Sequence, residues 1–316
     1  MSASLSILSR FLQSYKYRGT FNSSGKYRKS FFQCSSRMSS LKNKDLDLFY
    51  DTVMSLVKTA GELINEKISS RSKLIEVKSS EIDLVTETDQ QVEKLLIDGL
   101  SNHFPEHKFI GEESVSGGSQ SVLTDAPTWI IDPIDGTMNF VHSFPHSCVS
   151  IALFINQKPE IGIVYNPMLN QMFTARKGKG AFLNGKSIKV SGKTSLSDAL
   201  IMMEFGTSRD PEKGRVVLEN QKILMPQVHG LRALGSAALD MAMVACGAAD
   251  VYFEYGIHIW DIAAGELLVT EAGGFIMDPA GGEIDRLSRR VLVASSRELA
   301  EKLSQTLVQF YPTPRD

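Results

Sequence analysis

Two stretches in the first third of the chain repeat apolar residues at every third or fourth position. The first covers 45–68 and the second follows Thr88, and their apolar positions are Phe49, Val53, Leu56, Ala60, Leu63 and Ile64, then Val92, Leu95, Leu96 and Leu100. This spacing places the apolar residues on one face of a helix. The sequence therefore predicts two amphipathic helices here.

Short apolar runs bounded by turn residues predict strands further along. The runs at 108–111 and 128–132 lead into acidic residues, which is typical of buried strands whose ends present side chains. Turns rich in Asn, Pro, Gly and Lys then separate runs at 148–155, 160–165, 171–176 and 181–190. This pattern predicts a meander of antiparallel strands, with one more strand at 198–205.

Beyond residue 200 the pattern alternates between helix and strand. Helices are expected at 211–224, 236–246, 262–272 and 298–310, and strands at 228–232, 251–255 and 291–294. Such alternation implies sheets that are covered by helices. The change near residue 200 predicts two subdomains that share an interface.

Residues 1–44 form a separate region with nine Lys or Arg and no Asp or Glu, which leaves 45–316 with a net charge of −11. Leucines at helical spacing among Ser and basic residues are typical of a mitochondrial transit peptide. A disordered tail, or an untranslated-region artefact before a start at Met38, is the alternative. We expect the fold to lie within 45–316.

Composition excludes several protein classes. The 316 residues are 42% hydrophobic and 22% charged, which is ordinary for a globular protein and unlike a disordered or collagen-like chain. The scattered Cys34, Cys148 and Cys246 predict no disulfide framework and no zinc site, and fit a reducing compartment. No run of 18 apolar residues occurs, so no membrane span is expected. The acidic body argues against nucleic-acid binding.

The sharpest chemical motif lies at 129–137, where Asp132 and Asp135 are followed by Gly136 and Thr137. We expect the strand to stop at Asp132, because Pro133 has no N–H for strand pairing. Gly136 would then permit a tight turn. Two carboxylates and a hydroxyl would thus lie at one strand end, although any single Asp is more often an ordinary turn residue.

Two other motifs place acids at element boundaries. Glu112 and Glu113 follow the strand at 108–111, where surface exposure is the simpler explanation, and Asp261 precedes the apolar run 262–269, where it would serve as a helix N-cap. Carboxylates gathered in one buried site repel one another and need a cation. Oxygen ligands without a Cys or His cluster favour Mg²⁺ over Zn²⁺. The pattern predicts metal-assisted hydrolysis of a phosphate ester.

At these motifs the sequence resembles a known family. G-E-E-S at 111–114, W-I-I-D-P-I-D-G-T at 129–137 and W-D-I-A-A-G-E at 260–266 are similar to signatures of the inositol monophosphatase family, most of all its eukaryotic members. The likeness covers about 45–316. It implies an α/β fold, a five-layer αβαβα sandwich like that of fructose-1,6-bisphosphatase. It also implies a cytoplasmic, homodimeric hydrolase that releases phosphate from myo-inositol monophosphates by a metal-activated water, with two or three Mg²⁺ ions and inhibition by Li⁺.

The resemblance also implies roles for individual residues. The metal ligands would be Glu112, Asp132, the carbonyl of Ile134, Asp135 and Asp261, with Glu113 in support. Glu112, or Asp89 with Thr137, would activate the attacking water. Substrate contacts would come from Asp135, Gly136, Thr137, Thr207, Ala237, Glu254 and Asp261. Thr207 stands where the eukaryotic enzymes usually have Ser, which adds a methyl group near the substrate.

Rival functions remain open at this stage. Within the family, the substrate would instead be fructose 1,6-bisphosphate, 3′-phosphoadenosine 5′-phosphate or histidinol phosphate. A haloacid dehalogenase-like phosphatase is disfavoured, because its D-x-D pair has one residue between the acids and Asp132 and Asp135 have two. A catalytically inactive homologue that binds a metal or metabolite is the alternative from another class.

Overall fold

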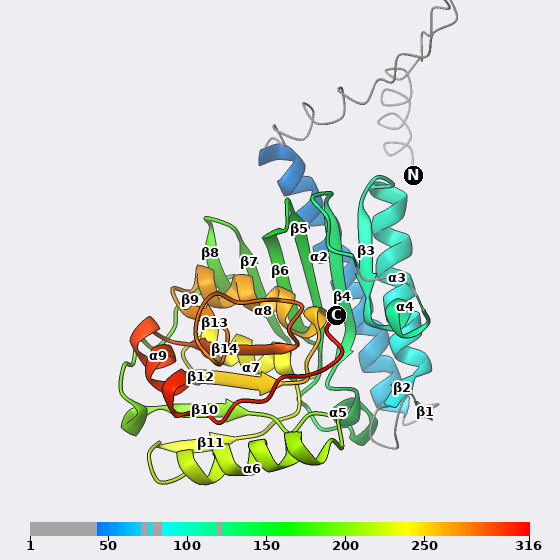
Figure 1. Ribbon diagram of the computed structural model, residues 1–316. Coiled ribbons are helices and arrows are strands. Elements are labelled where there is room, and N and C mark those ends of the chain that lie inside the picture. Colours follow the sequence, from blue (N-terminus) through cyan, green and yellow to red (C-terminus); the bar gives the residue numbers. More distant parts are fainter. Residues whose placement is uncertain (1–42, 71–74, 78–83, 119–121) are drawn as a thin grey trace, which may run out of the picture. The chain divides into compact units, whose positions relative to one another are not determined.

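A computed structural model describes residues 43–70, 75–77, 84–118 and 122–316 (Figure 1). The predicted transit peptide therefore lies outside the described residues, apart from its last two positions. Strands β1 (Ile75–Val77) and β2 (Leu84–Thr86) pair antiparallel with each other. The other described strands form two larger sheets.

The first of these sheets has seven strands in the order in which they occur along the chain. They are β3 (Lys108–Gly111), β4 (Thr128–Asp135), β5 (Cys148–Ile155), β6 (Lys158–Asn166), β7 (Gln171–Arg176), β8 (Gly180–Leu183) and β9 (Lys186–Ile188). β3 and β4 run parallel, and every later pair is antiparallel. The predicted meander is confirmed.

One predicted strand of the meander, 181–190, is in fact a hairpin. Leu183 pairs with Lys186, and Asn184 and Gly185 between them both have positive φ, at 50° and 76°. An Asn-Gly pair with both residues in this conformation closes a two-residue β-turn. The single apolar run therefore folds back on itself.

The second large sheet has five strands in the order β11-β10-β12-β14-β13. Their bounds are Leu200–Met203 for β10, Gly230–Arg232 for β11, Val251–Tyr255 for β12, Phe275–Met277 for β13 and Arg290–Ala294 for β14. β10 pairs parallel with β11 and β12, and the other pairs are antiparallel. β13 was not predicted, because three residues are too few for a periodic signal.

The longer helices lie where the sequence pattern placed them. They are α2 (Asn43–Ser70), α3 (Glu87–His103), α6 (Pro211–Leu224), α7 (Ala237–Ala245), α8 (Ile259–Glu271) and α9 (Arg297–Thr306). The prediction missed α4 (Glu112–Ser116), α5 (Thr137–His142) and the short 3-10 helix η2 (Leu196–Asp198). None of the helices in the described ranges is both long and apolar enough to cross a bilayer.

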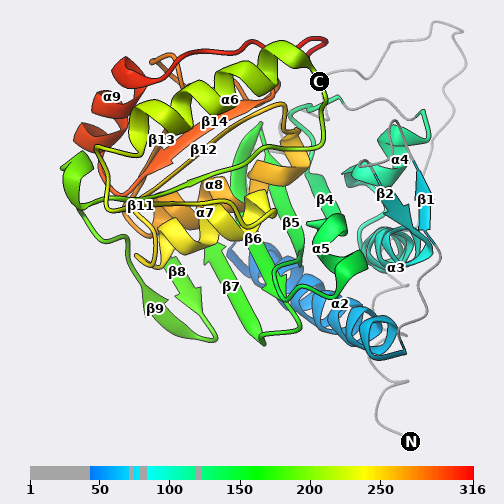
Figure 2. The same cartoon turned by 90° about the horizontal axis from the view of Figure 1, so that it is seen from below.

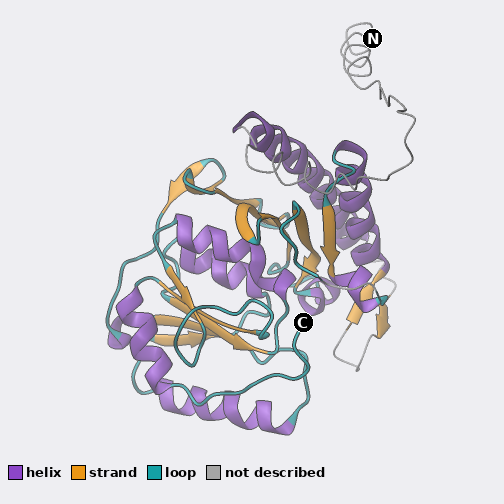
Figure 3. Ribbon diagram, turned by 45° about the horizontal axis from the view of Figure 1, so that its top comes forward, coloured by secondary structure: helices purple, strands orange, loops and turns teal. Residues whose placement is uncertain are grey.

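Helices α7 and α8 lie between the two large sheets (Figures 1 and 2). The side chains of β12 alternate accordingly. Tyr252 packs in the core with α7 and α8, whereas Val251, Phe253 and Tyr255 pack in an outer core with α6 and α9. The five-stranded sheet therefore has a helical layer on both faces (Figure 3).

The seven-stranded sheet is covered on both faces as well. On β6, Gly162 faces the backbone of Ala264 in α8, and Tyr165 faces Gly61 in α2. Residues three apart on a strand point to opposite faces. The layers within the unit from Asp47 to Asp316 are therefore helix, sheet, helix, sheet, helix, as predicted.

Candidate active site

Strand β4 brings two acids to one face through an irregularity. Asp132 pairs with Ser150 and Asp135 pairs with Cys148, so three steps on β4 match two steps on β5. In a regular strand, side chains three residues apart point to opposite faces. The extra residue is a β-bulge, which turns Asp135 to the same side as Asp132. The strand thus continues past Pro133 to Asp135, and the prediction that it stops at Asp132 was wrong.

The third acid comes from the start of α8. The predicted N-cap role of Asp261 is not observed, because the helix begins at Ile259 and its N-cap is His258. Asp261 is the third helical residue, and its Oδ2 accepts a 2.6 Å hydrogen bond from the backbone N–H of His258. This bond satisfies a free donor at the helix start and fixes the direction of the carboxylate.

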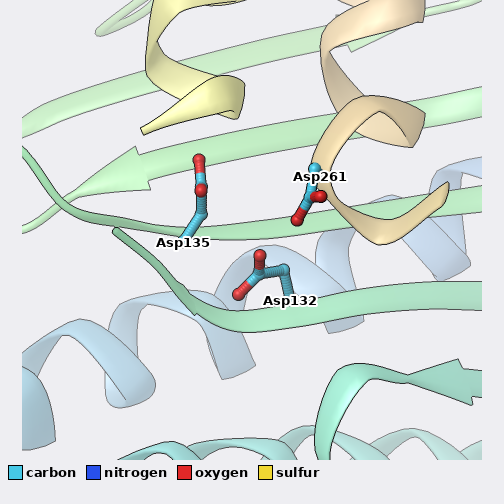
Figure 4. A group of neighbouring side chains, drawn as sticks. All are labelled: Asp132, Asp135 and Asp261. Atoms are coloured by element: carbon cyan, nitrogen blue, oxygen red, sulfur yellow. The ribbon is translucent and has the colours of Figure 1, made fainter. Parts of the chain in front are cut away.

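The three aspartates meet in one place. One carboxylate oxygen from each of Asp132, Asp135 and Asp261 lies within 4.8 Å of the others, and the side chains face a common space (Figure 4). Asp132 and Asp135 are 2% and 7% exposed. Three carboxylates this close and this buried repel one another strongly.

The pKa of each of the three groups is raised above its ordinary value. Burial is the largest cause in each case. Burial and the charges of Glu112, Asp135 and Asp261 raise the pKa of Asp132 well above its ordinary value. The pKa of Asp135 rises only to about 6, because Ser236 and Ala238 donate hydrogen bonds to it. The pKa of Asp261 is also raised well above its ordinary value.

The donor set fits a divalent cation. Oδ1 of Asp132 is buried and makes no hydrogen bond with the described residues. Asp135 Oδ2 is held by Ser236 Oγ at 2.7 Å and by the Ala238 N–H at 2.6 Å, which leaves its other oxygen for a ligand. Oxygen-only coordination of this kind suits Mg²⁺. A cation here would relieve the repulsion that raises the three pKa values.

Glu112 and Glu113 begin α4 directly after β3, on a second side of the cluster. Glu112 lies close enough to raise the pKa of Asp132, although its carboxylate is not part of the 4.8 Å group. The buried Glu93 of α3 fixes this turn, because its carboxylate accepts 2.8 Å hydrogen bonds from the N–H groups of Glu113 and Ser114. The sequence reasoning did not identify Glu93, whose position on an amphipathic helix gave no signal of this role.

Asp89 and Thr137 are brought together from 48 residues apart. Thr137 Oγ1 lies 3.2 Å from Asp89 Oδ1 and 3.1 Å from the carbonyl oxygen of Ile134. Either oxygen can accept a hydrogen bond from the hydroxyl. The other oxygen of Asp89 accepts a 2.9 Å hydrogen bond from the N–H of Thr86, the N-cap of α3. Asp89 is fully buried, so its carboxylate is held rigidly against the hydroxyl.

Gly136 allows the chain to turn from β4 into α5. Its φ is 87°, which favours glycine. A Cβ at this position would lie 2.8 Å from the carbonyl oxygen of Gly235 and 3.0 Å from that of His146. A side chain would therefore displace the backbone between Asp135 and Thr137.

Three of the predicted substrate-contacting residues belong to the part of the chain that forms the five-stranded sheet and α7. Glu254 is in β12, Ala237 is the first residue of α7, and Thr207 follows β10 in an exposed loop. Tyr252 donates a 2.6 Å hydrogen bond to Glu254 Oε2. Burial raises the pKa of Glu254 to about 7, although the nearby Lys213 lowers it. The charge of Glu254 also raises the pKa of Asp135 and Asp261, which places this residue near the cluster.

A second pair of buried acids was not predicted. Glu204, at the end of β10, faces the fully buried Asp240 of α7. Burial raises the pKa of Glu204 to about 8 and that of Asp240 well above its ordinary value. The N–H of Leu234 donates to Glu204, which ties the turn before Ala237 to β10. Neither oxygen of Asp240 has a hydrogen-bond partner among the described residues, and its Oδ1 lies 3.5 Å from Nε2 of His146.

A pocket among the described residues lies away from these acids. It has a volume of about 1010 Å³ and lies between α2 and strands β6 to β8. Its lining includes Tyr50, Tyr165 and Arg176 but none of the acids of the cluster. The gathered carboxylates, and not this pocket, therefore identify the candidate site.

Known proteins resemble this chain in sequence and in fold. A family model described as the inositol monophosphatase family matches residues 45–310. Human inositol monophosphatase 1 is 50% identical over 267 residues, which are 84% of this chain and 96% of the relative. The solved structure of the extragenic suppressor protein SuhB from Bartonella henselae is 33% identical, covers 83% of this chain and 99% of its own, and has a TM-score of 0.75. A lithium chloride-soaked inhibitory complex of staphylococcal inositol monophosphatase-1 is 26% identical, covers 85% of this chain and 96% of its own, and has a TM-score of 0.72.

Proposed function

The chain belongs to the inositol monophosphatase family and is a phosphoric monoester hydrolase, and we propose that it converts myo-inositol monophosphates to inositol and phosphate with Mg²⁺ as its cofactor. The observation that carries this proposal is the group of three aspartates around one buried space. An unpaired buried carboxylate such as Asp132 is costly without a cation. The alternative of an inactive binding protein has no supporting feature among the described residues.

Glu112, Asp132, the carbonyl of Ile134, Asp135 and Asp261 would hold two or three Mg²⁺ ions. Bound there, Mg²⁺ lowers the pKa of a coordinated water and stabilises charge on phosphate oxygens. Glu113 supports this set by its place in the turn that Glu93 holds.

The protein's own residues would orient the phosphate and accept a proton. The N–H groups of Gly136 and Thr137 would donate hydrogen bonds to the phosphate oxygens. The tight turn at Gly136 allows this arrangement. Thr137 Oγ1 is 3.2 Å from Asp89 and would pass a proton to that carboxylate while its oxygen accepts one from the attacking water. Glu112, whose charge acts on Asp132, is the second candidate acceptor for that proton.

We expect Thr137→Val to lower kcat by about 10²-fold, since a positioned proton acceptor contributes at least this much. Valine keeps the shape of threonine but has no hydroxyl for Asp89. Thr137→Ser restores the hydroxyl and should retain kcat within about tenfold of the wild type. Steady-state phosphate release measures both, and equal rates for the valine and serine variants would remove Thr137 from proton transfer.

The polyol part of the substrate would lie toward the five-stranded sheet. Glu254 and Ala237 would contact ring hydroxyls, and Thr207 would border the same space from its exposed loop. Asp135 and Asp261 would also face the substrate. They would lie between the residues that bind the phosphate and those that bind the ring hydroxyls. This division separates the residues that bind the phosphate from those that select the alcohol.

Phosphate release from a small panel tests the proposal. The panel is inositol 1-phosphate, fructose 1,6-bisphosphate, 3′-phosphoadenosine 5′-phosphate and histidinol phosphate, each with Mg²⁺, with chelator and with added Li⁺. We expect chelator-sensitive release chiefly from inositol 1-phosphate. Preference for another compound would keep the metal chemistry and reject the inositol assignment. No release from any of them would favour the binding-protein alternative.

Three finer properties belong to the same proposal. Inhibition by Li⁺ is suggested by the lithium complex of the staphylococcal relative. A homodimer and a cytoplasmic location follow only from the sequence resemblance, and the two free cysteines among the described residues, Cys148 and Cys246, agree with a reducing compartment. A mitochondrial location is the alternative if residues 1–37 act as a transit peptide.

A further inference from the structure

Helix α6 buries a lysine near its start. Asp210 caps this helix through 2.8 Å and 2.9 Å hydrogen bonds from the N–H groups of Glu212 and Lys213. Lys213 is only 2% exposed, and its Nζ makes no hydrogen bond or ion pair with any residue of the described chain. A buried ammonium without a partner is unfavourable for stability. Such a group calls for an explanation.

Two glycines let the ammonium reach the ends of β10 and β12. Gly206 and Gly256 follow these neighbouring strands with φ of 63° and 87°. A Cβ on Gly206 would lie 2.4 Å from Lys213 Nζ, and one on Gly256 would lie 2.9 Å from it. Any side chain at either position would therefore displace the ammonium.

The ammonium and Glu254 converge on the same spot. The Cβ built on Gly206 would also lie 3.1 Å from Glu254 Oε1. Tyr252 holds the other oxygen, Oε2, and Oε1 makes no hydrogen bond with the described residues. Glu254 is thus fixed on one side and has one oxygen left for a ligand, with the charge of Lys213 beside it.

Several charged or titratable neighbours act on this pair. Glu204, Asp240, Asp135 and Asp261 oppose the charge of Glu254, whereas the hydrogen bond from Tyr252 favours it. Arg289 opposes the charge of Lys213, and Asp210 and Asp261 favour it. The neighbouring acids disfavour the charged form of Glu254, as burial does. Lys213 is the positive group that favours it.

We propose that Lys213 is a specificity-determining positioning residue, whose charge favours the carboxylate form of Glu254 so that Oε1 accepts a hydrogen bond from a ring hydroxyl of the polyol phosphate. This inference rests on the proposed function, because it assigns the hydroxyl-binding role to Glu254. Lys213 acts through Glu254 and does not touch the reacting phosphate. Its contribution is therefore to substrate affinity and selectivity, and not to the chemical step.

Lys213→Met tests the inference in the full chain, with the exposed Lys222→Met on the same helix as the matched control. Kinetics are compared for inositol 1-phosphate and for phenyl phosphate, a monoester without ring hydroxyls. We expect KM for inositol 1-phosphate to rise about 10- to 100-fold, the usual effect of losing a hydrogen bond to a charged group. The kcat for that substrate, kcat/KM for phenyl phosphate, and both parameters of Lys222→Met should stay within about twofold.

Thermal unfolding separates this effect from misfolding. Methionine has nearly the size of lysine and carries no charge, so Tm should stay the same or rise by roughly 2–5 °C. The neutral, polar Lys213→Gln should show the same rise in KM, because the charge is what matters. A normal KM in either folded variant would overturn the inference.

A double variant shows whether Lys213 acts through Glu254. Glu254→Gln alone should raise KM for inositol 1-phosphate, and adding Lys213→Met should change it by less than about threefold, since the charge then has nothing to act on. Multiplied losses in the double variant would overturn the inference. A wild-type chain that shows no preference for inositol 1-phosphate over phenyl phosphate would instead contradict the proposed function.

Discussion

Asp132→Asn is expected to lower phosphate release by at least about 10³-fold. Asp132 lies among three other acids, since the charges of Glu112, Asp135 and Asp261 all raise its pKa. Its buried Oδ1 has no hydrogen-bond donor among the described residues. An amide has the same shape but no negative charge, so it would weaken the binding of Mg²⁺ and leave the phosphate without its counter-charge.

The same substitution should stabilise the chelator-treated protein, because it removes one of three mutually repelling charges. Calorimetric titration with Mg²⁺ should show weaker binding, and the melting temperature in chelator should rise. Asp98→Asn, in an exposed pair with Lys94, is the matched control and should change neither property. Near-normal turnover in Asp132→Asn would contradict a metal site at these carboxylates.

Much of the fold was predictable because its signals are local. The first and last residues of β3, β5, β7, α6 and β12 agree with the pattern of apolar residues. Each of these elements has a buried face long enough to show in that pattern. The misses have local causes too. The hairpin of β8 and β9 depends on the conformation of Asn184 and Gly185, and α4 and α5 are too short to show helical periodicity.

The sequence was enough to predict which residues belong to the candidate site, but not how they are arranged in space. The sequence indicated that Asp132 and Asp135 act together, yet the reason they share a face is a bulge that depends on pairing with β5. Asp261 was predicted as a metal ligand, with an N-cap as the simpler explanation, and the structure gives the N-cap position to His258. Glu93 was missed because it holds residues 20 and 21 positions away, and Lys213 was missed because its importance comes from Glu254 and Gly256, on another element of the fold.

The acids of the site also predict how pH and Mg²⁺ together set stability. A carboxylate whose pKa is higher in the folded than in the unfolded chain binds more protons when folded, so the free energy of unfolding decreases as pH rises between the two pKa values. For Asp135 this window runs from its ordinary value of 3.8 to about 6, and for Asp132 and Asp261 it extends higher. Asp135 alone accounts for about 3 kcal/mol of lost stability across its window.

Bound Mg²⁺ neutralises these carboxylates and should abolish the loss. We therefore expect the melting temperature in chelator to fall steadily from pH 5 to pH 8, and the increase on adding Mg²⁺ to grow over the same range to roughly 5–10 °C. Burial raises the pKa of Glu204 to about 8, so this group also titrates near the top of the range and contributes to the curve in chelator. Differential scanning calorimetry at matched ionic strength measures both curves. A Mg²⁺-induced increase that stays constant or shrinks as pH rises would show that the cation binds somewhere other than the three aspartates.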